Sequence, residues 1–395
     1  MRALIPTLFS DPYRVYELMR RRRPVLFVEE LDLWIVFRYA DVRSMVSGAF
    51  VSNDRRNIRT GYGAPLADDS ERALLRDLEK HMLLSEGPEH TRRRSAVARF
   101  FSPKMIENLK PTVDRLVDAL LDRFQARRSM DFMADFARQL PVHVIAGVIG
   151  LPTEDLPRFK IWTDALVVLN DPVKTDQERI EAFQTMPAMK EYFDELFARR
   201  RREPREDLIT ALACASGDAQ LTPEEMVATC SILMAAGHET VMHTLGNGLL
   251  SLEAFPKQKR LLRDDPSLVP TAVEELLRYS GPVQFQQRQT VSDYTLADKT
   301  IPGGAVVMPA YASANRDADA FEAPDELQLG RMKNPHMAFG HGRHHCIGAA
   351  LARTEMRSAL GRLFARFPSY EVDLTSMERR DSLWMRGLNR ITVHC

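Results

Sequence analysis

The segment AFGHGRHHCIG, residues 338–348, decides the fold of this chain. Its single cysteine, Cys346, follows a loop with two glycines and opens the apolar-periodic run CIGAALARTEMRSALGRLFARF, which predicts a helix over about 346–367. A thiolate at a helix N-terminus is stabilised by the macrodipole and the unpaired N–H groups. Gly340, Gly342 and Gly348 let the backbone turn sharply and let a flat cofactor approach the sulfur. The residues therefore favour a thiolate at Cys346 with space for a flat group beside it, and the alternative is a buried cysteine that packs as a small apolar residue.

The composition indicates a large core and no dominant charge. The chain has 395 residues, 45% of them hydrophobic, and its 54 Lys+Arg balance its 54 Asp+Glu. A balanced charge gives no indication of nucleic acid as a partner. No apolar run reaches the ~18 residues of a membrane span, and the N-terminal segment is too short and polar for a signal peptide or an anchor helix. We therefore expect a cytoplasmic protein with no membrane partner.

The four cysteines, at positions 214, 230, 346 and 395, fit neither a disulfide framework nor a Cys-x-x-Cys zinc site. Their spacing is typical of a protein from a reducing compartment. Cys214 and Cys230 lie in helical patterns, where we expect both to pack in the core.

The apolar periodicity predicts a mainly α protein with a small β lobe, folded as a single domain over residues 1–395. No repeat, low-complexity segment or long linker divides the chain. The β lobe is expected over about residues 20–40 and 283–309, with a C-terminal hairpin near Trp384, and residues 311–337 are expected to be irregular. Helices are expected at about 103–125, 132–150, 174–201, 222–254, 268–280 and 346–367.

The longest predicted helix begins at a capping box, TPEE at residues 222–225, and runs to about Phe255. At ~1.5 Å per residue it is ~50 Å long, enough to cross a whole domain. In its middle, Ala236 and Gly237 are small enough for a planar group to pack against the helix. Thr240 can divert a backbone hydrogen bond and bend the helix there.

The neighbouring Glu239 and Thr240 form an acid–alcohol pair, which can relay protons beside a cofactor. The alternative is a buried glutamate held by a cation and a threonine that only kinks the helix. A zinc-protease helix is excluded, because that site needs two histidines four residues apart on one face. His238 and His243 are five residues apart, which is about 140° around the helix.

Two further motifs carry charged side chains. In the predicted helix VPTAVEELLRYSG, Glu275 and Arg278 share one face and can form a pair. Arg331 lies fifteen residues before Cys346. The segment GPEHTRRR, residues 87–94, places His90 and Arg94 four apart on one face of a helix. Each of these motifs alone is common on solvated surfaces.

Taken together, the motifs resemble those of the cytochrome P-450 family, in the same order from residue 87 to residue 355. The loop matches Phe-x-x-Gly-x-x-x-Cys-x-Gly, and the long helix matches Ala/Gly-Gly-x-Asp/Glu-Thr. The resemblance implies the cytochrome P-450 fold, with a long central helix over a haem and the thiolate loop before the last long helix. It also implies haem b (iron protoporphyrin IX) ligated by the thiolate of Cys346. The chain has no Cys-x-x-Cys-His motif, so covalent attachment of the haem is not expected.

The resemblance also implies roles for individual residues. Glu239 and Thr240 would be catalytic and deliver protons for oxygen activation. Glu275, Arg278 and Arg331 would form a buried structural network. Arg343 and His345 depart from the smaller or apolar residues that are usual in the family, but they remove no ligand. The haem-binding set would be His90, Arg94, Ala236, Gly237, Arg288, Phe339, Gly340, His344, Cys346 and Gly348.

The implied function is that of a soluble, bacterial-type haem-thiolate monooxygenase, which inserts one oxygen atom of O2 into a C–H or C=C bond of an apolar small molecule. One alternative is a peroxide-driven or non-hydroxylating haem-thiolate enzyme, and another is a catalytically silent haem-binding relative that recruits partners. The retained Glu239 and Thr240 argue against both. Four scattered cysteines cannot hold an iron–sulfur cluster and there is no flavin module, so electrons are expected from a separate ferredoxin or flavodoxin with its reductase.

The partner and substrate surfaces are predicted from the same resemblance. A basic patch for an acidic redox partner is expected from five residues, and ordinary solvated cations are the alternative: Arg92, Arg93, Lys333, Arg343 and Arg353. Substrate recognition is expected in about 60–86, 160–190, the central helix, the turn after Arg278 and the C-terminal hairpin. These segments supply a mostly apolar set, with Gln284, Gln286 and Gln287 as polar additions: Leu83, Leu84, Val167, Leu169, Leu233, Val283, Phe285, Trp384 and Met385.

Overall fold

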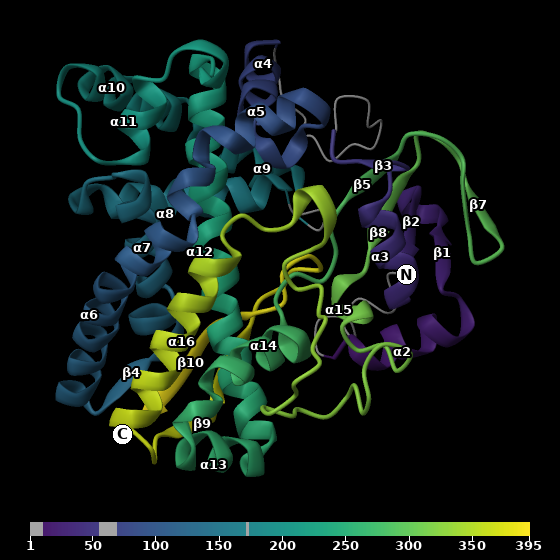
Figure 1. The fold of residues 1–395 in the computed structure, drawn as a ribbon, viewed down its shortest axis with the longest axis vertical. Coiled ribbons are helices and arrows are strands. Elements are labelled where there is room, and N and C mark those ends of the chain that lie inside the picture. The colour runs from purple at the N-terminus through teal and green to yellow at the C-terminus, as the bar shows by residue number, and fades with distance from the viewer. Residues whose placement is uncertain (1–10, 55–68, 171–173) are drawn as a thin grey trace. The chain divides into compact units, whose positions relative to one another are not determined.

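A computed structural model describes residues 11–54, 69–170 and 174–395 (Figure 1). The first ten residues and the part of the predicted 60–86 segment before residue 69 lie outside the described ranges. The chain divides into two compact units. The first comprises residues 1–58, 109–140 and 240–395, and the second comprises residues 59–108 and 141–239. All strands of the described ranges belong to the first unit.

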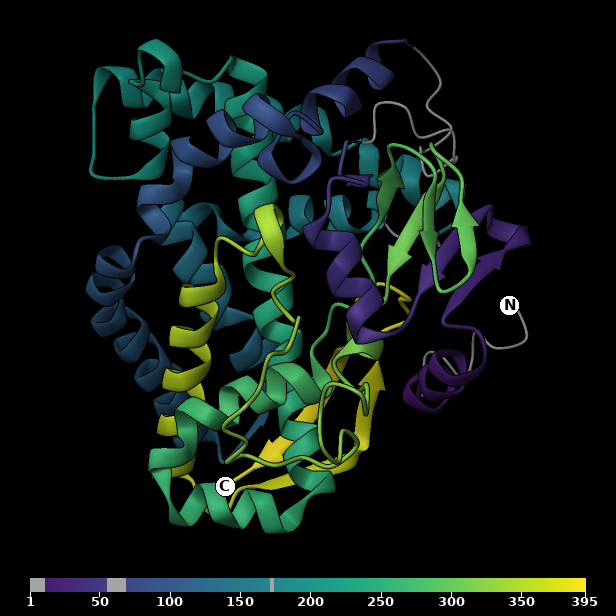
Figure 2. The ribbon, with the colours of Figure 1, turned by 45° about the vertical axis from the view of Figure 1, so that its right-hand side comes forward.

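The predicted β lobe forms a five-stranded sheet in the first unit, in the order β1-β2-β8-β5-β3 (Figure 2). Strands β1 (Val25–Val28) and β2 (Leu33–Val36) make the expected antiparallel hairpin, and β2 runs parallel to β8 (Val306–Pro309). Strands β5 (Arg288–Thr290) and β3 (Val51–Ser52) complete the sheet. Strands β6 (Tyr294–Leu296) and β7 (Lys299–Ile301) form a separate hairpin.

The two faces of this sheet pack against different helices. Leu33 and Ile35 belong to an apolar cluster with Tyr16 of α2 (Tyr13–Arg22). Val36 belongs to a second cluster, with residues of α3 (Tyr39–Ser47). Because successive side chains of a strand point to opposite faces, burial on both sides explains the continuous apolar run LWIV.

The C-terminal hairpin lies in a separate three-stranded sheet, in the order β4-β10-β9. Strands β9 (Glu371–Arg379) and β10 (Leu388–His394) pair antiparallel, and β10 also pairs with β4 (Ser129–Asp131). The remaining helices of this unit are listed here: α13 (Pro256–Asp264), α14 (Val269–Ser280), α15 (Tyr311–Ala314), α16 (Ala349–Arg366) and most of α6 (Pro103–Arg127). Ion pairs join α6 to α16, among them Arg362–Asp118 and Arg366–Asp122.

Among its described residues, the second unit contains helices and connecting loops but no strands. It contains α4 (Asp69–Leu78), α5 (Gly87–Ala98), α7 (Gln139–Ile149), α8 (Leu156–Asn170), α9 (Asp176–Phe183), α10 (Met186–Arg202) and α11 (Leu208–Ala213). Phe159, Tyr192 and Phe193 pack edge to face in its core. The long helix α12 (Pro223–Ala254) confirms the predicted 222–254 segment, and the unit boundary falls within it, after Glu239.

Several predicted boundaries need correction. The expected 174–201 helix is two helices, α9 and α10, because Pro187 in the first turn of α10 cannot donate a backbone hydrogen bond and starts a new helix. The expected 132–150 helix begins with a π-helical segment, Phe132–Ala137, ahead of α7. Cys214 is exposed at the end of α11 and not in the core, whereas Cys230 is buried as expected. The stretch Phe132–Ile149 is long and apolar enough to cross a membrane, but 61% of it is buried, as in the core of a soluble protein.

Glu355 of α16 is a buried carboxyl group that sequence analysis does not single out. It is 2% exposed, and within the described part of the chain its Oε2 atom has no hydrogen-bond partner. Burial raises the pKa of Glu355 well above its usual value of 4.5. The folded state therefore holds a proton that the unfolded chain releases above that pH, and stability falls as the pH rises through this window.

We predict that Glu355→Gln removes this pH-dependent loss. The melting temperature of the wild type should fall relative to that of the variant as the pH rises above 4.5, because one proton linked to folding changes stability by up to about 1.4 kcal/mol per pH unit. Glu191→Gln, at an exposed position of α10, is the control and should track the wild type. Parallel curves for wild type and Glu355→Gln would contradict the prediction.

Candidate functional site

The loop before α16 carries Cys346, which is an exposed residue. The Cys346 amide donates to the Phe339 carbonyl over 2.9 Å, and the His345 amide donates to the Gly342 carbonyl over 3.0 Å, so the loop closes on itself. Cys346 is exposed, which contradicts the alternative of a buried core cysteine. Cys230 shows the contrast, since complete burial raises the pKa of its thiol.

Two glycines of the loop are required by the backbone. Gly340 and Gly342 have φ angles of +69° and +73°, in the left-handed region that other residues rarely adopt. A Cβ at Gly342 would also lie 2.9 Å from the Val46 carbonyl oxygen. A Cβ at Gly348 would lie 3.9 Å from the Cys346 sulfur, so glycine there keeps space beside the thiol open. Helix α16 begins at Ala349, three residues later than predicted, and the thiol therefore precedes its first turn.

Ion pairs with Glu274 of α14 support this loop. The Arg353 guanidinium lies 4.4 Å from the centre of the Phe339 ring, and its Nε and Nη2 both donate to Glu274 over 2.8 Å. His336 Nε2 lies 3.1 Å from the same carboxylate. Burial raises the pKa of Glu274, but the hydrogen bonds from His336 and Arg353 outweigh it and lower the pKa to about 2. A fixed carboxylate therefore holds the arginine that packs on Phe339.

The structure brings together the three residues of the predicted structural network. Glu275 and Arg278 are 0% and 1% exposed and form two hydrogen bonds of 2.8 Å. Arg331 Nε donates to the same carboxylate over 3.1 Å. Asn334 and the backbone amide of Gln328 also donate to Glu275, contacts that the sequence does not reveal. The network fixes the irregular segment that leads into the thiolate loop.

On α12, the predicted residues occupy different environments. Ala236 is exposed and Thr240, one turn later, is half-buried, so one strip of the helix is accessible. Glu239 is 3% exposed. Gly237 is needed for helix packing, because a Cβ there would lie 2.7 Å from Ile145 Cγ1 of α7. The helix continues through Thr240 without a break.

The predicted partners of the haem carboxylates are basic groups in both units. His90 of α5 is 5% exposed, and Arg94 of the same helix is half-buried. Arg288 is buried and donates to the Gln287 carbonyl and the Gln286 side chain over 2.8 Å each. His344 is half-buried, two residues before Cys346.

The predicted substrate residues also fall into groups. Val283 and Met385 face each other across a β-bridge, and the Gln284 amide donates to the Trp384 carbonyl over 2.8 Å. Phe285 packs edge to face on Tyr16 in the core. The others lie in the second unit: Leu83 and Leu84 in a 3-10 turn (Met82–Leu84), Val167 and Leu169 on α8, and Leu233 on α12.

The predicted basic patch is largely neutralised. Arg92 and the buried Arg93 both pair with Glu225 at the start of α12, and Arg353 pairs with Glu274. Burial raises the pKa of Glu225, but hydrogen bonds from Arg92, Thr222 and Arg93 outweigh it and lower the pKa to about 2. Lys333 and Arg343 are exposed. Three of the five cations are therefore structural partners of carboxylates that lie far away in the sequence.

These residues fit a thiolate-ligated haem. The only sulfur ligand that the loop offers is exposed, its backbone amide is held by Phe339, and glycine leaves room beside it. The family model "Cytochrome P450" matches residues 64–392. This chain belongs to the cytochrome P450 family.

The relatives match over nearly the whole length. The chain is 38% identical over 392 residues to cytochrome P450 107B1 of Saccharopolyspora erythraea, covering 97% of this chain and 95% of that protein. It is 37% identical over 395 residues to the vitamin D(3) 25-hydroxylase of Pseudonocardia autotrophica, covering 98% and 94%. The fold is similar to that of P450BioI, solved in complex with a hexadecenoic acid-ligated acyl carrier protein, with a TM-score of 0.91, 32% identity and coverage of 99% and 100%.

Membership of this P450 family makes the protein an enzyme, a monooxygenase whose cofactor is thiolate-ligated haem b. The predicted mainly α fold with small sheets is confirmed. The family uses O2 and a redox partner.

We predict that Cys346→Ser abolishes the red-shifted band that a thiolate ligand gives to the reduced carbonyl complex, because an alcohol does not replace the thiolate at neutral pH. Cys214→Ser changes the other exposed cysteine and should keep the wild-type spectrum. Difference spectra of the three purified proteins are the measurement. A retained band in Cys346→Ser would show that another residue is the ligand.

Proposed function

We propose that this P450 is a cytoplasmic monooxygenase that inserts one oxygen atom into a C–H or C=C bond of a medium or large apolar molecule, with electrons from a separate ferredoxin or flavodoxin. The observation that carries the proposal is the exposed Cys346 thiol on a loop closed by the Phe339 carbonyl. It lies in a chain that matches monooxygenases of the family over nearly its full length.

In this proposal, the haem supplies the iron that activates O2, and the protein supplies ligand, orientation and protons. Cys346 is the ligand. His90, Arg94, Arg288 and His344 provide positive charge or hydrogen bonds for the cofactor's carboxylates.

The proton-donating role belongs to Glu239 and Thr240. A carboxyl group that is 3% exposed is shielded from bulk water, so protons reach it only through neighbouring groups. The adjacent Thr240 is half-buried and can pass a proton on through its hydroxyl.

The substrate class is inferred from the apolar recognition residues and from the relatives. Val283, Trp384 and Met385 gather where the 283–285 segment meets the C-terminal hairpin. Similar structures were solved with myristic acid and with testosterone. A fatty acyl chain and a steroid share an apolar body with few polar groups, and this is the chemistry that we propose for the substrate.

We predict a low-to-high spin shift of the Soret band when a compound of this class binds, because an apolar ligand would exclude water from the cofactor site. A panel of myristic acid, testosterone and an apolar macrolide tests this, with glucose as the polar control. A shift only with polar compounds would overturn the proposed substrate class.

Catalytic roles for the acid and the alcohol lead to a second prediction. Thr240→Ala should keep haem and ligand binding but divert electrons to peroxide or water. Glu239→Gln should slow turnover, within the ~10²–10⁴-fold range of general acid–base catalysis. Product and peroxide are measured per NADPH consumed, with Thr229→Ala on the same helix as the control. If both variants kept the wild-type turnover rate and the wild-type yield of product per NADPH, the proposed proton-donating role of Glu239 and Thr240 would be wrong.

A further inference from the structure

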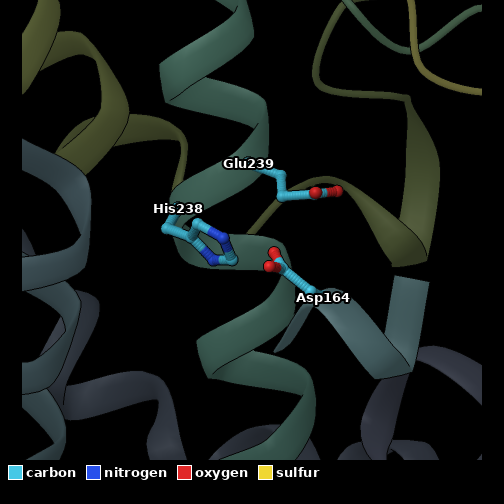
Figure 3. Close-up of side chains that lie close together, drawn as sticks. All are labelled: Asp164, His238 and Glu239. Carbon is cyan, nitrogen blue, oxygen red and sulfur yellow. The ribbon is translucent and has the colours of Figure 1, made fainter. Parts of the chain in front are cut away.

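Three titratable side chains gather on one side of α12 in the second unit. Figure 3 shows His238 and Glu239 of α12 with Asp164, which reaches them from α8. Each residue offers one nitrogen or oxygen atom that could bind a metal ion, and these three atoms lie within 4.8 Å of one another. The Asp164 side chain is 47% exposed, whereas His238 and Glu239 are 4% and 3% exposed. The three side chains therefore extend from the exposed Asp164 to the buried carboxyl group of Glu239.

The hydrogen bond of His238 defines which of its ring nitrogens can exchange a proton. Nδ1 lies 2.9 Å from the Met234 carbonyl oxygen. A carbonyl oxygen only accepts, so Nδ1 carries the hydrogen in this contact. Nε2 is then the ring nitrogen that remains available for proton exchange.

A metal ion is the other chemistry that three such groups could serve. Lys160 argues against it, because its Nζ lies 2.6 Å from Asp164 Oδ2 and already provides the carboxylate with a positive partner. The group also contains a single nitrogen ligand, and the nearby pocket wall adds no second histidine.

A small, mostly apolar pocket lies beside His238 on the side of α8. A pocket of about 20 Å³ is lined by His238 together with Lys160 and Thr163, and such a volume holds one water molecule. The α7 residues on its wall, Val142, Ile145 and Ala146, are uncharged. Among the residues that line this pocket or belong to the three-residue group, the charged ones beside His238 are Asp164 and Lys160 from α8 and Glu239 on its own helix.

We propose that Asp164 and His238 form the solvent-side entrance of the proton path to Glu239. A proton that arrives at the Asp164 carboxylate passes to Nε2 of His238, which becomes an imidazolium. Nε2 then gives the proton to the Glu239 carboxylate and the ring returns to neutral, so one proton enters, one leaves and no electron moves. Asp164 and His238 touch no reacting atom. They are positioning residues that act through Glu239, and the proposal rests on the proposed monooxygenase function.

The stoichiometry of the reaction provides a sharp test. Oxidation of a substrate RH by O2 gives ROH and water and consumes two electrons and two protons. Oxidation by hydrogen peroxide gives the same products with no net uptake of protons. Loss of a proton entrance should therefore slow the first reaction and spare the second.

The test uses three single variants of the holoenzyme. Asp164→Asn removes the exposed carboxylate. His238→Asn keeps a donor for the Met234 carbonyl but has no exchanging nitrogen. Asp194→Asn is the matched control, because Lys190–Asp194 is a pair of the same spacing on α10, also 2.6 Å long.

The first readout does not depend on turnover. Nitrogen NMR of the histidine-labelled, diamagnetic ferrous carbonyl complex follows the titration of His238, whose signals are assigned by their loss in His238→Asn. Asp164→Asn should lower the pKa of His238 by about one unit or more, since a nearby anion stabilises the charged ring. Asp194→Asn should leave that pKa unchanged. An unshifted pKa in Asp164→Asn would overturn the proposal.

The second readout compares oxidants with 7-ethoxycoumarin as the fluorogenic probe. With a surrogate ferredoxin and its reductase, product formation should fall about 10-fold or more in Asp164→Asn and His238→Asn, as expected for a lost proton donor. With peroxide, product formation by both variants should match that of the wild type. The control Asp194→Asn should match the wild type with both oxidants. Equal losses with both oxidants would show a structural contact and overturn the relay. A wild type inactive with both would count against the monooxygenase function instead, and the NMR titration would still decide the proton entrance.

Discussion

Two adjacent carboxylates on α14 hold the segment on which the cofactor site depends. The chain between α15 and α16 contains little regular structure, yet it must present one thiol in a fixed position. Glu275 binds Arg278 and Arg331 at its start, and Glu274 holds Arg353 against Phe339 near its end. Burying a charge costs several kcal/mol unless every partner is present, so these contacts stabilise one arrangement strongly and alternatives poorly. The thiolate loop is therefore positioned by a helix far away in the sequence.

The central helix α12 buries many polar side chains, and each of them needs a hydrogen-bond partner. Ser231, Thr244 and Ser251 each donate a hydroxyl to the backbone carbonyl four residues earlier, and His238 uses the same kind of contact. These local bonds give each hydroxyl group and the imidazole ring a partner on the helix itself. An ionised carboxylate cannot donate in this way. Glu239 lies close to Asp164 of α8, a neighbour from another helix.

Ion pairs also explain why the predicted basic patch carries so little unpaired positive charge. Ion pairs join Arg92 and Arg93 to Glu225 of α12. Another ion pair joins Arg353 to Glu274 of α14. Glu225 both caps α12 and binds the two arginines of α5, so one carboxylate sets the start of the central helix and anchors its neighbour. A basic residue near a predicted site is thus no measure of surface potential.

The sequence by itself determined the helical class, the β lobe and the capping box of α12, because these depend on periodicity and on contacts between residues close in the chain. Its loop motif also put forward Cys346 as the proposed haem ligand. It also indicated the Glu275–Arg278 pair, whose members lie on one helix face. Only the tertiary structure decided that Glu225 neutralises Arg93, that Cys214 is exposed and that Asp164 lies beside His238. Such contacts join residues that are distant in sequence, and a local pattern contains no information about which distant side chain will arrive.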